Sequence, residues 1–224
     1  MNWNKPMKNG KFYTVAREIL RPFMHIVFPY TVIGREHLPQ SGGYILASNH
    51  KSYIDPFYLE YAASPRQIRF MAKQELFGHF GLKQLITMLG AFMVTRGRED
   101  AGALNRGAEI VRQGGIVGIF PEGTRGYENP PSRAKAGIAV VASRCEGDVI
   151  PVCIVTKQQV KPFRRVKVVI GPKISHQDLR LPDDPTTKDL KRVANLIMER
   201  ITALWDEHAI DDELTTKTTK NTKN

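Results

Sequence analysis

The sequence predicts an α/β fold, in which a single domain holds a largely parallel central sheet flanked by helices. Three observations favour this class. Short apolar runs rich in β-branched residues alternate with longer amphipathic patterns along most of the chain. Each run is continuously apolar, as in parallel strands that are buried on both faces. The 224 residues, of which 42% are hydrophobic, are enough for one sizeable core.

Seven apolar runs predict the strands of this sheet. In chain order they are YTVIG (30–34), YILAS (44–48), IRFMA (68–72), FMVT (92–95), GIVGIF (115–120), VIPVCIV (149–155) and VKVVIG (166–171). Helices are expected at DPFYLEYAA (55–63), FGLKQLITMLG (80–90), DAGALNRGAEIVRQG (100–114), SRAKAGIAVVASR (132–144) and residues 186–207. The sheet domain is therefore expected to span residues 31–210, followed by a disordered tail over residues 211–224.

Residues 1–30 contain a basic, aromatic helical segment ahead of the domain. Pro22 is expected to kink or split this helix. Its apolar side chains recur at helical spacing, at Phe12, Val15, Ile19, Phe23 and Ile26. Such a segment can lie in a membrane interface, or it can pack on the core of its own domain. The pattern alone leaves both alternatives open.

The formal net charge of +11 predicts an anionic partner. Residues 211–224 carry three acids and three lysines, so the excess lies on the folded body. Residues 157–173 add six basic residues and no acid, which suits an anionic membrane surface. No RNA-binding signature or zinc-ligand spacing occurs, so nucleic acid is not the expected partner. Cys145 and Cys153 form no disulfide framework, which fits a reduced, cytosolic environment.

His50 and Asp55 are the first candidate catalytic residues. His50 follows the YILAS run, and ligands of open α/β sheets bind at the carboxyl ends of strands. Pro56 suits the first residue of a helix, which makes Asp55 its expected N-cap. One carboxylate oxygen can cap the helix while the other accepts from the imidazole. His50 would then present its other nitrogen as a general base, whereas helix capping alone is the structural alternative.

A second polar group follows the GIVGIF run, in FPEGTRG (120–126). Pro121 ends the strand, and Glu122, Gly123, Thr124 and Arg125 then form a polar loop at the same sheet edge. Gly123 lets backbone N–H groups approach a ligand closely, and the planar guanidinium of Arg125 suits phosphate. The alternative is a plain strand-exit turn.

Further basic residues follow other strand candidates. Arg96 and Arg98 come after FMVT, Lys73 and Glu75 follow IRFMA, and Lys135 lies in SRAKAG. Taken singly, each is more typical of a solvated surface than of a binding site.

Four blocks in the order NHKSYID (49–55), GAFMVTR (90–96), FPEGTR (120–125) and VIPV (149–152) resemble the sequence blocks of the phospholipid and glycerol acyltransferase superfamily. Within it, the chain is most similar to bacterial 1-acyl-sn-glycerol-3-phosphate acyltransferases of the PlsC type. The resemblance extends from about residue 31 to residue 171, and MAKQELF (71–77) also matches a block of the lysophosphatidate branch.

The resemblance implies transfer of an acyl group from acyl-CoA or acyl carrier protein to the 2-hydroxyl of lysophosphatidic acid, which gives phosphatidic acid. His50 would be the general base and Asp55 would orient it. The implied acceptor-binding residues are Lys73, Arg96, Glu122, Gly123, Thr124 and Arg125. No metal or organic cofactor is implied. The resemblance also favours membrane contact by residues 12–30, with the protein peripheral or monotopic at the cytoplasmic face of the cell membrane.

Two other functions stay open from the sequence. One is a sister acyltransferase that acts on another lysophospholipid or on glycerol-3-phosphate. The other is a basic membrane- or nucleic-acid-binding module without catalysis. Hydrolysis would need a water-activating site, which the sequence does not indicate, and no nucleophilic serine or cysteine lies in a recognisable elbow.

Overall fold

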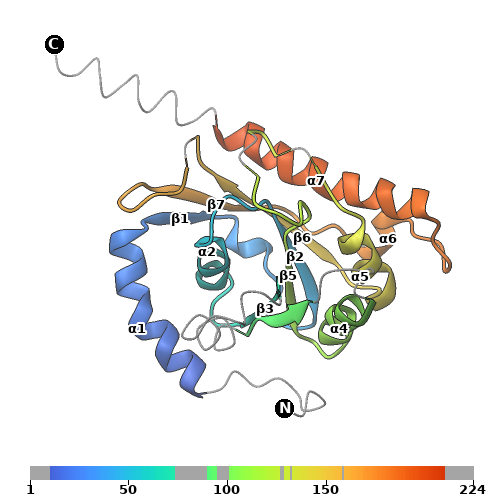
Figure 1. Ribbon diagram of the computed structural model, residues 1–224, viewed down its shortest axis with the longest axis horizontal. Coiled ribbons are helices and arrows are strands. Elements are labelled where there is room, and N and C mark those ends of the chain that lie inside the picture. Colours follow the sequence, from blue (N-terminus) through green and yellow to red (C-terminus); the bar gives the residue numbers. More distant parts are fainter. Residues whose placement is uncertain are drawn as a thin grey trace.

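The computed structural model describes residues 11–73, 90–94, 101–126, 129–131, 133–157 and 159–209. Seven strands of this part of the chain form one sheet, in the order β1-β7-β6-β2-β5-β3-β4 (Figure 1). They are β1 (Tyr30–Ile33), β2 (Tyr44–Ser48), β3 (Ile68–Lys73), β4 (Phe92–Val94), β5 (Ile116–Ile119), β6 (Val149–Val155) and β7 (Val166–Ile170). All seven strands predicted from the apolar runs are confirmed.

The sheet is mixed, with its larger part parallel. Strands β6, β2, β5, β3 and β4 run parallel to one another, which confirms the largely parallel sheet. β7 pairs with β6 in the antiparallel sense, and β1 pairs with β7 in the parallel sense. The reversal has a simple cause: residues 156–165 are a short connection between neighbouring strands, whereas a parallel return needs a longer crossover, usually a helix.

Helices account for most of the remaining described chain. They are α1 (Lys11–Val27), α2 (Asp55–Ala62), α4 (Ala101–Arg112), α5 (Gly137–Cys145), α6 (His176–Leu179) and α7 (Thr187–Ala209), with a 3-10 turn at Arg35–His37. The helix predicted at 132–144 begins only at Gly137, because the Lys135 N–H donates to the Pro121 carbonyl in the strand-exit loop (2.8 Å). The helix predicted at 80–90 lies outside the described residues, apart from its last position.

Helices cover both faces of the sheet. Side chains of α4, α5 and α7 pack on one face, and those of α2 pack on the other. In β2, Ile45 and Ala47 belong to the first layer, whereas Tyr44 and Leu46 belong to the second. All five residues of this strand are buried, which explains why its sequence is continuously apolar.

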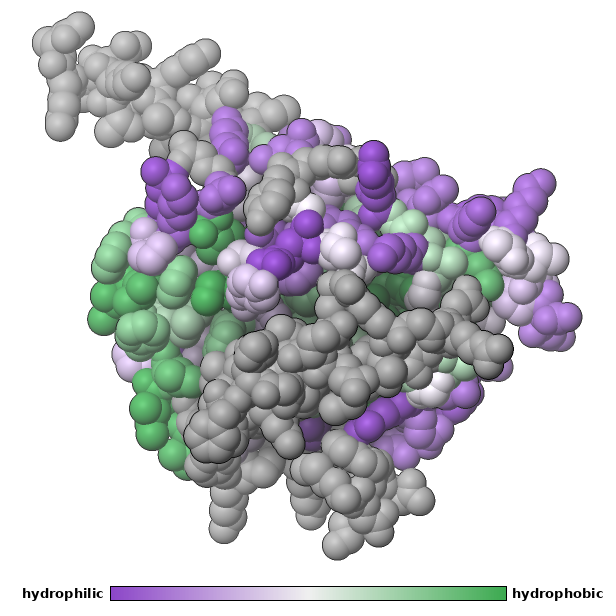
Figure 2. Space-filling view, in the orientation of Figure 1, coloured by the Kyte–Doolittle hydropathy of each residue, from purple (hydrophilic) through white to green (hydrophobic). Residues whose placement is uncertain are grey.

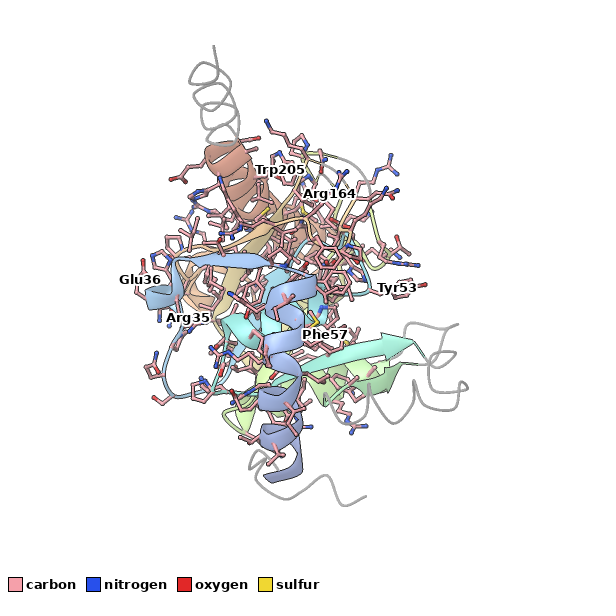
Figure 3. All side chains as sticks on the ribbon, turned by 90° about the vertical axis from the view of Figure 1, so that its left-hand side faces the viewer. Arg35, Glu36, Tyr53, Phe57, Arg164 and Trp205 are labelled. Atoms are coloured by element: carbon pink, nitrogen blue, oxygen red, sulfur yellow. The ribbon has the colours of Figure 1, made fainter. Side chains whose placement is uncertain are left out.

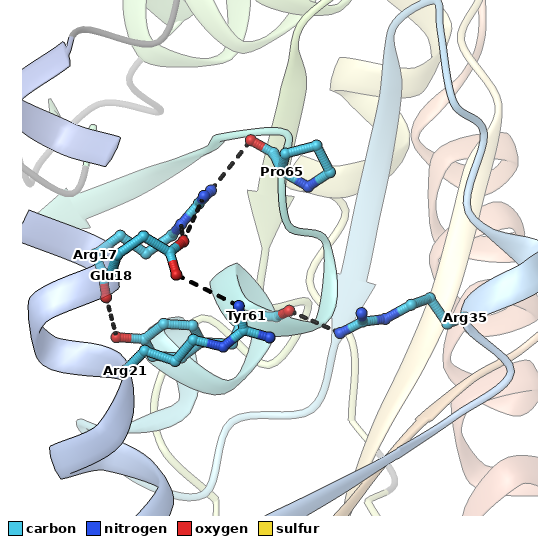
Figure 4. A network of polar contacts seen from close by, with 6 residues as sticks. All are labelled: Arg17, Glu18, Arg21, Arg35, Tyr61 and Pro65. Carbon is cyan, nitrogen blue, oxygen red and sulfur yellow. Dashed lines mark hydrogen bonds and ion pairs between the residues drawn. The ribbon is translucent and has the colours of Figure 1, made fainter. Parts of the chain in front are cut away.

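Helix α1 lies along one side of the molecule and is anchored to α2 and the turn after it (Figure 4). The Tyr61 hydroxyl donates to the Arg17 carbonyl, and the Arg17 guanidinium donates to the Pro65 carbonyl, each over 3.1 Å. Pro22 does not split this helix, since α1 runs unbroken from residue 11 to residue 27. Pro22 is exposed, so water can replace the hydrogen bond that its missing N–H would have made.

The apolar stripe predicted on α1 points away from the core. Val15, Ile19, Phe23 and Ile26 are 55–69% exposed, while the side chain of Phe12 lies outside the described residues. The helix instead turns Tyr13, Arg17 and Met24 inward. Figure 2 shows apolar side chains gathered on this side of the molecule. Packing of the stripe on the protein's own core is therefore excluded for its four described members.

Candidate active site

The loop after β2 is fixed to β6 by Asn49. Its fully buried amide accepts from the Ile154 N–H over 2.7 Å and donates to the Ile154 carbonyl over 3.1 Å. Both hydrogen-bonding groups of one strand residue are thus used by a single side chain. The next residue, His50, therefore leaves the sheet at a fixed point at the carboxyl end of β2.

His50 and Asp55 form the predicted pair. Imidazole Nδ1 lies 2.8 Å from Asp55 Oδ2, and the same oxygen accepts from the backbone N–H groups of Lys51 (2.6 Å) and Ser52 (2.7 Å). Because Oδ2 acts as the acceptor throughout, Nδ1 carries the proton and Nε2 is the basic nitrogen. The Asp55 side chain is fully buried, whereas that of His50 is 19% exposed.

The predicted capping role of Asp55 is wrong. Asp55 is the first residue of α2 and Ile54 is the N-cap residue, with no side-chain cap hydrogen bond. The carboxylate turns back to the loop that precedes the helix, where two N–H groups and the imidazole converge on one oxygen. Its other oxygen, Oδ1, is buried and has no hydrogen-bond partner among the residues that the structure describes.

The imidazole plane is set by an aromatic neighbour that the sequence did not point to. Phe120 stacks on His50 with ring centroids 4.0 Å apart and planes 16° apart, and Phe70 stacks in turn on Phe120 at 5.9 Å. The ring stack and the Asp55 hydrogen bond together restrict rotation of the His50 side chain. Phe120 directly precedes Pro121 in the FPEGTR block, so the same segment supports the base and opens the polar loop.

The loop after β5 is bonded to the loop after β2. The Gly126 N–H donates to the His50 carbonyl over 2.8 Å. Gly123 has a φ of 70°, a left-handed conformation that favours glycine, and the Lys135 side chain lies directly over it. A Cβ placed on Gly123 would come within 2.9 Å of Lys135 Nζ. A further cation therefore borders this loop, although sequence reasoning placed Lys135 at the surface.

Glu122 is the acid with the most altered environment at this edge. Burial raises its pKa to about 7. The backbone N–H groups of His50 and Gly126 and the Lys51 ammonium oppose this rise, because they favour the charged form. The Lys51 side chain is itself buried, 2.7 Å from Asn129 Oδ1 and 5.3 Å from the Trp205 ring centroid on α7. Near neutral pH, Glu122 is thus divided between its neutral and charged forms.

The guanidinium of Arg125 lies over the ring of Tyr53. Its guanidinium carbon is 3.5 Å from the centroid of the Tyr53 ring, which is 65% exposed. Tyr53 stands between His50 and Asp55 in the chain, so this contact again joins the two loops. In Figure 3 the Tyr53 side chain reaches outward at the margin of the molecule.

The structure brings six of the eight predicted site residues to one edge of the sheet: His50, Asp55, Glu122, Gly123, Thr124 and Arg125. Lys73 ends β3, but its side chain lies outside what the structure describes, and so does the whole of Arg96. The anchoring residues Asn49, Phe120 and Tyr53 were not predicted. Within the described ranges, no group of three His, Cys, Asp or Glu residues is placed to hold a metal ion.

The fold and this edge define an α/β domain in which a histidine–carboxylate pair lies beside a loop that carries an arginine. Comparison with known families assigns this domain to a family. The model of the acyltransferase family matches residues 29–155, more than half of the chain, and the protein belongs to this family.

Individual relatives extend the comparison over most of the chain. A 1-acyl-sn-glycerol-3-phosphate acyltransferase of Bacillus subtilis is 27% identical over 195 residues, which cover 86% of this chain and 96% of the relative. The enzyme of the same name from Streptococcus pneumoniae is 28% identical over 92% of this chain and 78% of its own. The crystal structure of PlsC, the 1-acyl-sn-glycerophosphate acyltransferase of Thermotoga maritima, superposes with a TM-score of 0.62 over 88% of this chain and 78% of its own. At 19% identity, that superposition supports the fold alone.

Proposed function

We propose that this protein transfers an acyl group from acyl-CoA or acyl carrier protein to the 2-hydroxyl of 1-acyl-sn-glycerol-3-phosphate, which gives phosphatidic acid and a free thiol. The observation that carries the proposal is the 2.8 Å contact between His50 Nδ1 and Asp55 Oδ2, on a loop bonded to the one that holds Arg125. The similarity to two bacterial enzymes named for this activity supplies the substrate class.

In the proposed reaction, His50 Nε2 removes the proton of the acceptor hydroxyl as its oxygen attacks the thioester carbonyl. The tetrahedral intermediate collapses with cleavage of the carbon–sulfur bond, and the imidazolium returns its proton to the leaving thiolate. Asp55 holds the Nδ1–H tautomer throughout and stabilises the positive charge of the imidazolium. The hydroxyl proton thus passes through His50 to the leaving thiolate, and the acyl group passes to the hydroxyl oxygen, so no external base is needed.

The acceptor phosphate is proposed to bind beside this base. Arg125 offers a planar fork of N–H donors, and the Lys135 side chain that covers Gly123 adds a further cation to the loop. Lys73, Arg96 and Thr124 complete the proposed set. Fixing the phosphate holds the glycerol hydroxyl near His50 and converts a bimolecular step into a nearly unimolecular one, which can lower the barrier by several kcal/mol.

The raised pKa of Glu122 suits an acid next to a bound phosphate. A fully charged carboxylate would repel a phosphate monoester, whereas a carboxyl group with a pKa of about 7 is neutral in a large fraction of molecules near neutral pH. In its protonated form, Glu122 can also donate a hydrogen bond to an acceptor oxygen. Protonated Glu122 can therefore take part in binding the acceptor, whereas a charged carboxylate at this position would repel the phosphate.

Membrane contact is proposed for α1, within a membrane-associating segment that comprises residues 1–30 ahead of the domain at 31–210. The exposed stripe of Val15, Ile19, Phe23 and Ile26 can insert among lipid acyl chains. No helix among the described residues is long and apolar enough to span a bilayer. The location that we propose is peripheral or monotopic, at the cytoplasmic face of the cell membrane.

The loop between β6 and β7 extends the proposed membrane surface. Phe163 is 73% exposed and has a φ of 63°, unusual for a residue other than glycine. Its N–H donates to the carbonyl of Val27, the last residue of α1, over 2.6 Å, so the loop adjoins that helix. Arg164 and Arg165 beside it are exposed. The charge of residues 157–173 is not all available, however, since Lys173 pairs with Asp148 at 2.7 Å.

Acceptor choice tests the proposed function. Thiol release from acyl-CoA is measured with the purified protein and three acceptors in turn: lysophosphatidic acid, glycerol-3-phosphate and lysophosphatidylcholine. The proposal expects release with lysophosphatidic acid and formation of phosphatidic acid, identified by mass spectrometry. Faster release with either of the other acceptors would assign the protein to a sister activity of the family.

A further inference from the structure

Arg125 is held through the face of its guanidinium rather than through its N–H groups. The contact with Tyr53, at 3.5 Å from guanidinium carbon to ring centroid, is at stacking distance. Among the residues that the structure describes, no hydrogen bond or ion pair occupies the donors of Arg125. Those donors lie in the guanidinium plane and point outward from its edge, so stacking leaves them available to a phosphate.

Tyr53 is itself placed by the proposed catalytic carboxylate. Asp55 Oδ2 accepts from the N–H groups of Lys51 and Ser52, the Ile54 N–H donates to Ser52 Oγ over 3.2 Å, and the Asp55 N–H donates to the Ser52 carbonyl over 3.3 Å. The tight turn that results carries the Tyr53 ring outward, where it is 65% exposed. A side chain exposed to this extent contributes little to the core, and its ring is in contact with the Arg125 guanidinium.

The same short loop therefore carries the base and the support of the arginine. His50 and Tyr53 are three residues apart, and the Gly126 N–H bonds the second loop to the first at the His50 carbonyl. A free arginine side chain loses rotamer entropy when it binds an anion, and an arginine already held on a ring loses less. The ring thus lowers the cost of gripping the acceptor and keeps the guanidinium at a fixed place relative to the imidazole.

We propose that Tyr53 is a positioning residue, whose ring holds Arg125 ready to bind the phosphate of the acceptor. This inference rests on the proposed function, in which Arg125 binds that phosphate. The aromatic character of residue 53 thereby becomes a determinant of acceptor affinity, while binding of the acyl donor does not depend on it. The Tyr53 hydroxyl has no part in this role.

Steady-state kinetics with three variants test the inference. An exposed cation–π contact corresponds to about a two- to five-fold change in a binding constant. Tyr53→Leu, which removes the ring but keeps an apolar side chain, is therefore expected to raise the KM for lysophosphatidic acid about two- to five-fold, with little change in the KM for acyl-CoA. Tyr53→Phe is the matched control, since it keeps the ring, and it is expected to match the wild type. Unfolding midpoints of both variants check that the loop remains folded.

A double-mutant cycle separates positioning of Arg125 from a general effect on the loop. In an Arg125→Gln background, Tyr53→Leu has nothing left to position and is expected to leave the acceptor KM unchanged. An equal effect of Tyr53→Leu in both backgrounds would overturn the inference. If Arg125→Gln raises the acceptor KM and Tyr53→Leu does not, the inference fails and the proposed function stands. If Arg125→Gln leaves that KM unchanged, the proposed phosphate role of Arg125 fails and the inference falls with it.

A spectroscopic measurement tests the contact without reference to activity. In protein labelled with ¹⁵N-arginine, the Nε–H proton of Arg125, assigned from its loss in Arg125→Lys, is expected to be shifted upfield by the Tyr53 ring current. Tyr53→Phe should retain this shift and Tyr53→Leu should abolish it. A resonance that does not respond to Tyr53→Leu would show that the two side chains are not stacked in solution, and would overturn the inference.

Discussion

Gly126 donates its backbone N–H to the His50 carbonyl over 2.8 Å, and this bond joins the loop after β5 to the loop after β2. The proposed base lies on one loop and the proposed phosphate ligand on the other. The stack of Phe120 on His50 and of Arg125 on Tyr53 adds two more connections between them. The position of His50 relative to Arg125 is therefore set by contacts between loops that are about 70 residues apart in the chain.

The connection at Gly126 can be tested with one methyl group. A Cβ at this position would come within 2.9 Å of Glu122 Oε2, so Gly126→Ala must displace either the carboxylate or the loop. We expect thiol release by the variant, measured as kcat/KM, to fall roughly 10- to 100-fold, as for a small misplacement of reacting groups. Gly137→Ala is the control, because its Cβ would meet only Leu104 Cδ2 at 3.6 Å. Equal rates in the two variants would argue against a shared, rigid site.

Asn49 makes a prediction about stability rather than catalysis. Asn49→Ala would leave both the N–H and the carbonyl of Ile154 without their partner inside the protein. We expect a loss of about 2–4 kcal/mol in the free energy of unfolding, measured with urea. Asn195→Ala, at an exposed position on α7, should cost far less. A small and similar change in both variants would contradict the anchoring role.

Glu122 should make stability depend on pH. Its pKa rises from 4.5 to about 7 on folding, so the folded protein binds more protons than the unfolded chain between these values. The contribution of Glu122 to stability therefore falls as the pH rises through this window. Glu122→Gln removes the titrating group. The difference in unfolding free energy between this variant and the wild type should therefore shift by about 1–3 kcal/mol in favour of the variant when the pH is raised from 5 to 8. Glu199→Gln, at an exposed position, is the control, and its unfolding free energy should change with pH as that of the wild type does. The same pH dependence in Glu122→Gln would show that the pKa of Glu122 is not raised.

Membrane binding should depend on the loop that carries Phe163. Basic residues near an anionic surface contribute about 1 kcal/mol each, so Arg164→Gln/Arg165→Gln should weaken binding to phosphatidylglycerol-containing vesicles by up to about thirty-fold in a sedimentation assay. Binding to neutral phosphatidylcholine vesicles should change little. The matched double variant is Lys188→Gln/Lys191→Gln, which removes two exposed charges from α7. Equal losses in the two double variants would indicate a diffuse charge effect and no defined membrane surface.

Much of the fold could be predicted because its signals are local. A strand buried on both faces has to be apolar throughout, so each of the seven runs identified a strand by itself. Strand direction is not local in this sense, and the antiparallel β7 follows from the short connection over residues 156–165. The boundary of α5 shifted for a related reason, since the Lys135 backbone is bonded to a loop from elsewhere in the chain.

The site divides in the same way between local and distant contacts. His50 and Asp55 could be paired because five positions in one loop suffice to bring them together. Local rules also assigned Asp55 to the helix cap, and the nearer N–H groups of Lys51 and Ser52 took its oxygen instead. Asn49 meets a strand 105 residues away, and Arg125 meets Tyr53 across two loops. Neither contact can be predicted from the spacing of residues in the sequence.

The rate of phosphatidic acid formation in His50→Ala, compared with the wild type, tests the central claim most directly. Acyl-CoA and lysophosphatidic acid are supplied to both proteins at equal concentrations, and the product is measured alongside thiol release. The account predicts turnover by the wild type, a loss of about a hundred-fold or more in the variant, and unchanged unfolding midpoints. Turnover by the variant at the wild-type rate, or no phosphatidic acid from either protein, would contradict it.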